Sequence, residues 1–436
     1  MRRVALLAAL LVSAAPVAAQ TPPKAPVATA VTKAADRDVA RIRASAGFKA
    51  ALASLDAGHD AFVEEIVELT EIPAPPFKEA VRAKAVAEKF RAIGLKDVTI
   101  DAEGNVLGLR PGSDPALPMV AIAAHLDTVF PEGTPIKVRR EGTKLFAPGV
   151  GDDTRGVAAL LAYARALDAG KITTRAPILF VADVGEEGRG DLRGVRYLFT
   201  KGAMKDRIGA FISVDGGGDS RVTHAGVGSK RYHVVFKGPG GHSYGAFGIV
   251  NPMAAMSSAV SELYKIELPA SPRTTYAASV TGGGTSVNAI PDEVFIDIDM
   301  RSESAAALAD LEKRFLGIVQ ASVAGENSAR STRFGAISAD PQVIGDRPAG
   351  ATPDNAALVQ STAAAIRAFG LTPGFGASST DANLPMSLGI PAITVGSGGG
   401  GGRGHSLDEW IDVAKPESLR GLSVGLLTLI AAAGAN

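Results

Sequence analysis

The chain has 436 residues, with 45 basic and 45 acidic side chains, so its formal net charge is zero. A balanced charge without a long lysine or arginine run argues against a nucleic-acid footprint or an anionic-membrane patch, and favours chemistry on small molecules or peptides. Cysteine is absent, which excludes disulfides and thiolate ligands, so any metal must be held by histidine and carboxylates.

The amino terminus is typical of a secretory signal peptide. Met1-Arg-Arg3 is positively charged, Val4–Val12 is apolar, and small residues follow up to Ala19. We therefore predict a signal peptide at residues 1–19, cleavage near Ala19 and export to the periplasm or beyond. The apolar run is too short to cross a bilayer and no other stretch is long enough, so no membrane span is expected. Residues 20–39, rich in Pro, Ala and Thr, predict a flexible leader.

The length predicts two domains. Residues 40–225 and 342–436 predict the two parts of an α/β domain with a mostly parallel sheet flanked by helices. Helices are expected at Ala40–Leu55, Phe62–Leu69, Glu79–Ile93 and Ala356–Phe369. Buried strands are expected at Met119–Ala124, Ile178–Ala182, Phe211–Val214 and Ala392–Val395. The glycine tract Gly396–Gly402 predicts a site loop whose backbone closely approaches another group.

Residues 226–341 have a different pattern, which predicts an inserted α+β domain. Its strands are expected at Tyr232–Phe236, Thr275–Val280 and Val294–Met300, and its helices at Met253–Tyr264 and Ala305–Val319. The α/β signals resume after it, so the main domain is interrupted rather than complete before the insertion begins.

Two adjacent carboxylates, Asp152 and Asp153, stand in the glycine-rich turn Gly149–Gly156 just before a helical pattern. Taken alone, such a pair is better explained as a helix cap. Other polar residues that end predicted strands change this interpretation, because the carboxyl ends of such strands commonly form sites.

These strand-end residues include two histidines and several carboxylates. His125 and Asp127 are two apart and point the same way, so Asp127 can orient the imidazole of His125. Glu186 and Glu187 project in different directions, so one can bind a metal while the other acts as a base. With Asp152, Asp215 and His405, the set offers enough ligands for two cations.

The order His-x-Asp, Asp-Asp, Glu-Glu, Asp and a late His, with Gly-Gly-His-Ser in the insertion, resembles the co-catalytic di-zinc metallopeptidases. That family includes peptidase T, glutamate carboxypeptidase, aminoacylase and succinyl-diaminopimelate desuccinylase. The resemblance implies two Zn²⁺ per subunit, with Co²⁺ or Mn²⁺ as substitutes. It implies that Asp152 bridges both ions, with His125 and Asp215 completing one site. Glu187 and His405 complete the other.

The resemblance also implies that Glu186 is the general base, that Asp127 supports the ligands, and that the Asp152–Asp153 peptide bond is cis. The inserted domain is implied to be a lid and dimerisation domain. Its His242 would reach across a homodimer to the scissile carbonyl, while Asn288 and Arg301 would grip the substrate. Thr154 and Arg155 follow the Asp pair where many relatives carry Lys.

The leading functional hypothesis is a secreted zinc exopeptidase acting on small peptides. An N-acyl-amino-acid amidohydrolase is an open alternative. A non-catalytic peptide-binding protein is disfavoured because it has no need for Glu186 as a base. A di-zinc aminopeptidase without an inserted domain is disfavoured because this insertion carries His242 and Arg301.

Overall fold

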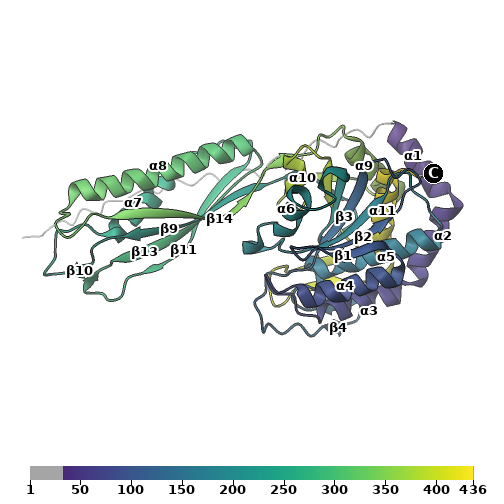
Figure 1. Cartoon of the computed structure of the whole chain (residues 1–436), viewed down its shortest axis with the longest axis horizontal. Coiled ribbons are helices and arrows are strands. Elements are labelled where there is room, and N and C mark those ends of the chain that lie inside the picture. The colour runs from purple at the N-terminus through teal and green to yellow at the C-terminus, as the bar shows by residue number, and fades with distance from the viewer. Residues whose placement is uncertain (1–32, 436) are drawn as a thin grey trace, which may run out of the picture.

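The computed structural model describes residues 33–435, so the predicted signal peptide and most of the predicted leader lie outside the described residues. The chain forms a main domain and an elongated inserted domain that extends from one side of it (Figure 1). Helix α1 (Lys33–Ala44) begins earlier than the expected start of order near Ala40, so the end of the predicted leader is helical. Val39 and Ile42 are buried in the core, and Asp36 pairs with Arg367 of helix α9, which accounts for this order.

The sheet of the main domain has a parallel centre and antiparallel edges. Its strand order is β1-β2-β6-β3-β7-β17-β8-β15, with β16 beside β8. Strands β6, β3, β7 and β17 are parallel neighbours, whereas β1, β2, β8 and β15 pair antiparallel toward the edges, and β16 pairs parallel with β8. The bounds are β1 Lys96–Ile100, β2 Val106–Arg110, β3 Met119–His125, β6 Ile178–Asp183, β7 Ile208–Val214, β8 Arg221–Gly226, β15 Gly350–Ala351, β16 Gly374–Ser378 and β17 Ala392–Val395.

Helices cover both faces of this sheet. In β3, Val120, Ile122 and Ala124 join the core under one helical layer, while the alternate residues Met119 and Ala121 join the core under the other. A continuous apolar run rather than an alternating one is what a strand buried on both sides requires. The helices are α1, α2 Ala46–Ala57, α3 His59–Thr70, α4 Ala80–Ile93, α5 Arg155–Ala169, α6 Arg193–Thr200, α9 Ala357–Ala368, α10 Asn383–Ser387 and α11 Lys415–Ala433.

The inserted domain is an antiparallel sheet of order β11-β13-β9-β14, packed on two helices. Its elements are β9 Gly228–Lys237, α7 Pro252–Leu263, β11 Thr274–Gly283, β13 Glu293–Ser302, α8 Ala305–Ala329 and β14 Ser338–Arg347, with a small ladder of β10 Gly241–His242 and β12 Ala289–Ile290. Helix α8 runs past the expected end at Val319. The sequence pattern did not indicate its last turns, because they are polar and mostly exposed and so lack an apolar period.

Strand β14 connects the insertion back to the main domain. It continues to Arg347, a few residues past the boundary expected after residue 341. Pro341 fits within it because β14 is an edge strand, where a missing N–H can face solvent.

A further small sheet, β18-β19-β5-β4, lies beside the turn Val150–Thr154 that precedes α5. Its strands are β4 Arg139–Glu141, β5 Lys144–Phe146, β18 Gly400–Gly402 and β19 Trp410–Asp412. Part of the glycine tract expected as a loop is therefore a strand. Across residues 33–435, no helix combines the length and the apolar character needed to cross a bilayer.

Candidate metal centre

All of the expected metal ligands come together at the carboxyl ends of the central strands. His125 is the last residue of β3, Glu187 follows β6, and Asp215 directly follows β7. Parallel neighbours end at the same edge of a sheet, so these side chains converge. Asp152 enters from the turn before α5, and His405 enters from the loop after β18.

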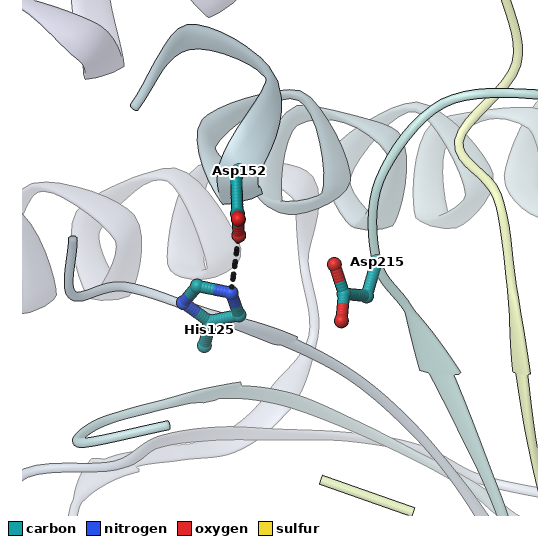
Figure 2. A group of neighbouring side chains, drawn as sticks. All are labelled: His125, Asp152 and Asp215. Carbon is teal, nitrogen blue, oxygen red and sulfur yellow. Dashed lines mark hydrogen bonds and ion pairs between the residues drawn. The ribbon is translucent and has the colours of Figure 1, made fainter. Parts of the chain in front are cut away.

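Three groups of side chains in the described chain have ligand atoms within 4.8 Å of one another. They are His125–Asp152–Asp215, which Figure 2 shows, Asp152–Glu187–His405, and His125–Glu186–Glu187. His125 Nε2 lies 3.0 Å from Asp152 Oδ1, and His405 Nε2 lies 3.0 Å from Asp152 Oδ2. Because each oxygen of Asp152 faces a different histidine, this carboxylate is placed to bridge two ions.

The charges of the centre suit cations. Burial, with the charge of Asp152 adding to it, raises the pKa of Asp215 to about 7. Hydrogen bonds to Asp152 and Glu187 raise the pKa of His405 to about 10. Without an ion the cluster therefore binds extra protons, and divalent ions would replace that positive charge. Carboxylate oxygens and imidazole nitrogens are suitable ligands for Zn²⁺, and carboxylates also suit Mn²⁺.

Asp127 ties the ligand-bearing segments together. Its carboxylate accepts the backbone N–H groups of Glu186 at 3.0 Å and Glu187 at 2.9 Å. The Nδ1 atom of His125 lies 3.0 Å from the backbone carbonyl oxygen of Asp127 and 3.7 Å from its carboxylate. Asp127 thus supports His125 through its main chain, while its side chain fixes the loop that carries Glu187.

The turn that carries Asp152 is held by a residue to which the sequence pattern assigned no role. The carboxylate of Glu409 accepts N–H groups from Gly149 at 2.8 Å, Gly151 at 2.8 Å and Asp152 at 2.9 Å. Glu409 is buried and lies four residues after the ligand His405. The Asp152–Asp153 peptide bond is cis, as the resemblance implied.

Glu186 has an environment distinct from that of the ligands. Arg347 Nη1 donates to Glu186 Oε1 at 2.8 Å, and Arg347 Nη2 donates to the backbone carbonyl oxygen of Glu186. Burial raises the pKa of Glu186 to about 8, against the opposing charge of Arg347 and with the charge of Glu187 adding to the rise. Arg347, like Glu409, was not identified from the sequence.

A cavity of about 600 Å³ lies between the two domains in front of these residues. The main domain contributes Asp152, Glu186 and His405 to its wall, and the inserted domain contributes Arg301 and Arg347, the last residue of β14. Arg301 Nε donates to Asp299 at 2.7 Å, which holds the guanidinium at the cavity wall. The expected position of Arg301 near the site is thus consistent with this geometry.

His242 and Asn288 do not line this cavity. Both are exposed and lie next to each other in the inserted domain, where Ser243 donates its N–H to the Asn288 carbonyl at 2.9 Å. His242 Nδ1 accepts the N–H groups of Tyr244 and Gly245, each at 3.2 Å, so Nε2 is directed away from this turn. Within one chain, therefore, neither residue joins the metal ligands.

The sequence profile of the peptidase family M20/M25/M40 matches residues 121–429. The chain belongs to this family. The resemblance inferred from the motifs is thereby confirmed, and the expected class of enzyme, a metallopeptidase or amidohydrolase, agrees with the family. The match includes every proposed metal ligand and the whole inserted domain.

Individual relatives support the same assignment. An N-carbamoyl-L-amino-acid amidohydrolase of Paenarthrobacter aurescens is 30% identical over 169 residues, which are 38% of this chain and 34% of that protein. The match thus spans about a third of that relative's length. The solved structure of aminopeptidase PepT from Bacillus cereus has a TM-score of 0.69 at 21% identity, covering 86% of this chain and 99% of that chain.

A further solved structure, the YXEP protein of Bacillus subtilis, is described as a dinuclear metal-binding peptidase of family M20. Its TM-score is 0.64 at 16% identity, covering 86% of this chain and 98% of that chain. At these identities the two solved structures establish the fold, including the inserted domain, and not the substrate.

Metal binding is expected to weaken as the pH falls through about 7, where Asp215 takes up a proton. A ligand must be deprotonated to bind a metal, so its raised pKa makes protons competitors. The dissociation constant for zinc, measured by chelator competition, should be lower at about pH 8 than at about pH 6 after correction for the chelator's own protonation. Protonation of His405, with a pKa of about 10, acts in the same direction, so equal affinity at both pH values would contradict the ligand roles of Asp215 and His405 together.

Proposed function

We propose that this protein is a zinc-dependent exopeptidase that hydrolyses amide bonds of small peptides. The observation that carries the proposal is the position of Glu186. It lies within 4.8 Å of ligand atoms of His125 and Glu187 and lines the cavity between the domains. The two groups that share Asp152 each have three members without Glu186, so its carboxylate can serve as a base.

Two zinc ions held by the ligand groups would polarise the scissile carbonyl and activate the attacking water. Glu186 would take a proton from that water and deliver it to the leaving amine. Arg347 keeps Glu186 directed at the cavity, and Asp127 fixes the main chain of Glu186 and Glu187. These fixed positions lower the cost of organising the site during the reaction.

The cavity favours a substrate with a free carboxylate. Arg301 lines it, and a guanidinium can bind both oxygens of a carboxylate, whereas Arg347 is engaged by Glu186. Its volume of about 600 Å³ suits a small peptide rather than a folded protein. An N-acyl-amino-acid substrate has the same carboxylate, so a deacylase is the second candidate, supported by the local similarity to an N-carbamoyl-L-amino-acid amidohydrolase.

A substrate screen tests these possibilities. The mature protein, loaded with zinc, should be assayed on dipeptides, tripeptides, N-acetyl amino acids and N-carbamoyl amino acids. The exopeptidase proposal requires release of a terminal amino acid from peptides. Turnover of only the N-acyl or N-carbamoyl compounds would favour the amidohydrolase, and binding without turnover would support a peptide-binding protein.

We propose further that His242 acts in the site of a partner subunit in a homodimer. In its own chain it is exposed and outside the cavity, and Asn288 accompanies it. The inserted domain projects away from the main domain, so its far end is available to a second copy (Figure 1).

Mixing two inactive variants tests this arrangement. After subunit exchange between Glu186→Gln and His242→Ala chains, each heterodimer has one site with both residues intact. About a quarter of all sites should then regain activity under random twofold pairing. Each variant incubated alone is the control. A mixture that remains as inactive as its parents, after exchange is verified by mass spectrometry of tagged subunits, would show that His242 does not act in trans.

We also propose that the protein is exported. The charged start, the apolar run and the small residues before Ala19 support cleavage near that position. Amino-terminal sequencing of protein recovered from the periplasm or the medium should give a start near Gln20. Recovery of the chain only inside the cell, with residues 1–19 retained, would contradict the proposal.

A further inference from the structure

A second cavity, of about 430 Å³, adjoins the candidate metal centre. It is lined mainly by glycines from two segments, the turn Gly216–Gly218 and strand β18. Asp152 is the one residue that lines both this cavity and the cavity between the domains. The proposed bridging ligand therefore stands where the two spaces meet.

At several positions in this region, the backbone conformation or the packing of the chain requires glycine. Gly216, Gly218, Gly398 and Gly399 have positive φ angles between 64° and 96°. Gly396 has no room for a side chain, because an added Cβ would lie 2.4 Å from the carbonyl oxygen of Gly217. Conformation or packing thus explains these positions without a ligand.

Gly400 is different. Its φ angle is not positive, and an added Cβ would meet only Asp412 Cβ, at the ordinary contact distance of 3.8 Å. Neither the backbone nor the packing of this chain requires glycine there. Gly404, where the nearest atom to an added Cβ is Asp152 Oδ2 at 4.0 Å, has the same freedom. Both residues line the second cavity, and their missing side chains leave space at its wall.

Strand β18 also has an open edge. In the described part of the chain it pairs with β19 on one side and ends the sheet on the other, where the turn Gly216–Gly218 lies against Gly399 and Gly400 at the start of the strand. An edge strand presents main-chain N–H and C=O groups that can pair with an added strand. Peptide ligands commonly use this mode of binding, in which main-chain hydrogen bonds supply affinity without requiring a particular side chain.

The two cavities indicate which end of a bound peptide lies on which side of the metal centre. Arg301 lines the cavity between the domains, so we place the terminal carboxylate of the substrate there. A peptide whose scissile bond lies at Asp152 would then extend its amino-terminal part into the glycine-lined cavity.

We propose that β18 and the turn Gly216–Gly218 form a subsite that binds the main chain of the substrate upstream of the scissile bond, as a strand added to the β18 edge. The inference rests on the proposed peptidase function and narrows it. The preferred substrates are peptides with two or more residues before the scissile bond, released one residue at a time from the carboxyl end. The glycines offer only main-chain groups, so selection by side chain in this subsite is left to Trp410 and Ile411, which also line the cavity.

The first test uses the unaltered zinc-loaded protein. A tripeptide should be compared with the same tripeptide methylated on the amide nitrogen before the scissile bond, which removes one N–H and blocks strand pairing. We expect KM to rise about tenfold on methylation, the size of one lost main-chain hydrogen bond. Equal KM values for the two peptides would overturn the subsite.

The second test substitutes Gly400→Val, which places a branched side chain at the cavity wall. The ratio of kcat/KM for the tripeptide to kcat/KM for the corresponding N-acetyl amino acid should fall about tenfold, because only the tripeptide reaches β18 with an amide N–H. Gly374→Val is the matched control. It is another exposed glycine without a positive φ, with its nearest neighbour to an added Cβ also at 3.8 Å, and it lies at the other end of β16 from the cavity residue Ser378.

The outcomes distinguish failure of the subsite proposal from failure of the exopeptidase proposal. If N-acetyl amino acids and tripeptides are both hydrolysed and Gly400→Val leaves their ratio unchanged, the subsite is wrong and the hydrolase assignment stands. If no peptide is hydrolysed by the zinc-loaded protein, both the exopeptidase proposal and the subsite fail. Should Gly400→Val fail to fold, the methylated peptide still decides the question.

Discussion

Glu186→Gln is expected to reduce kcat by about a hundredfold or more while zinc content stays the same, on the usual magnitude of general acid–base catalysis. The substitution removes the basic carboxylate but keeps an oxygen that can accept from Arg347 Nη1, which lies 2.8 Å from Glu186 Oε1. The fold around the site should therefore persist. Zinc is measured by atomic emission on the purified protein, and kcat on the best peptide from the substrate screen.

Glu65→Gln provides a matched control for this substitution. Glu65 is also a buried glutamate paired with an arginine, Arg165, but it lies on α3 outside the ligand groups. Its loss should lower stability and leave kcat close to the wild-type value. Unchanged kcat in Glu186→Gln would remove Glu186 from the role of base, and loss of zinc in that variant would identify Glu186 as a ligand.

Asp152→Asn is expected to have the largest effect on metal content. His125 and His405 contact different oxygens of Asp152, so removal of its charge weakens both ligand groups together. His125 belongs to one of the two groups that contain Asp152, so His125→Ala should leave the group of Asp152, Glu187 and His405 intact. After dialysis we expect less zinc in Asp152→Asn than in His125→Ala, and no detectable peptidase activity in Asp152→Asn.

Asp297→Asn is the matched control for Asp152→Asn. It also removes a negative charge from the cavity but removes no proposed metal ligand. Asp297 lines the same cavity but pairs with His233 at 2.6 Å and belongs to no ligand group. Zinc content should be unchanged in this control. Retention of the full wild-type zinc content by Asp152→Asn would mean that this carboxylate does not bridge.

The main domain could be predicted from sequence because its centre has a simple pattern. Strands buried on both faces leave continuous apolar runs, and β3, β6, β7 and β17 were all located by them. The outer strands were not identified. Strand β1 is exposed at four of its five positions, so burial leaves almost no pattern there. Short strands such as β15 and β18 depend on pairing with distant segments, which local sequence does not report.

The candidate site was predicted in part for a similar reason. Ligands follow strands, so their types and order could be read along the chain. Glu409 and Arg347 act through partners far away in sequence. Glu409 caps N–H groups in a turn more than 250 residues earlier, and Arg347 contacts Glu186 across 161 residues. Only the folded arrangement identifies such residues.

The hydrogen bonds of Glu409 to the turn of Asp152 link the metal centre to a segment late in the sequence. Glu409 and the ligand His405 lie on one short segment, and that segment both orders the turn of Asp152 and supplies the second histidine. A growing chain that has completed the inserted domain still lacks His405 and Glu409. The group of Asp152, Glu187 and His405 can therefore form only after the segment of His405 and Glu409 has folded back across the first half of the main domain. A chain cut short before residue 405 would lack one ligand of that group and the support of the Asp152 turn.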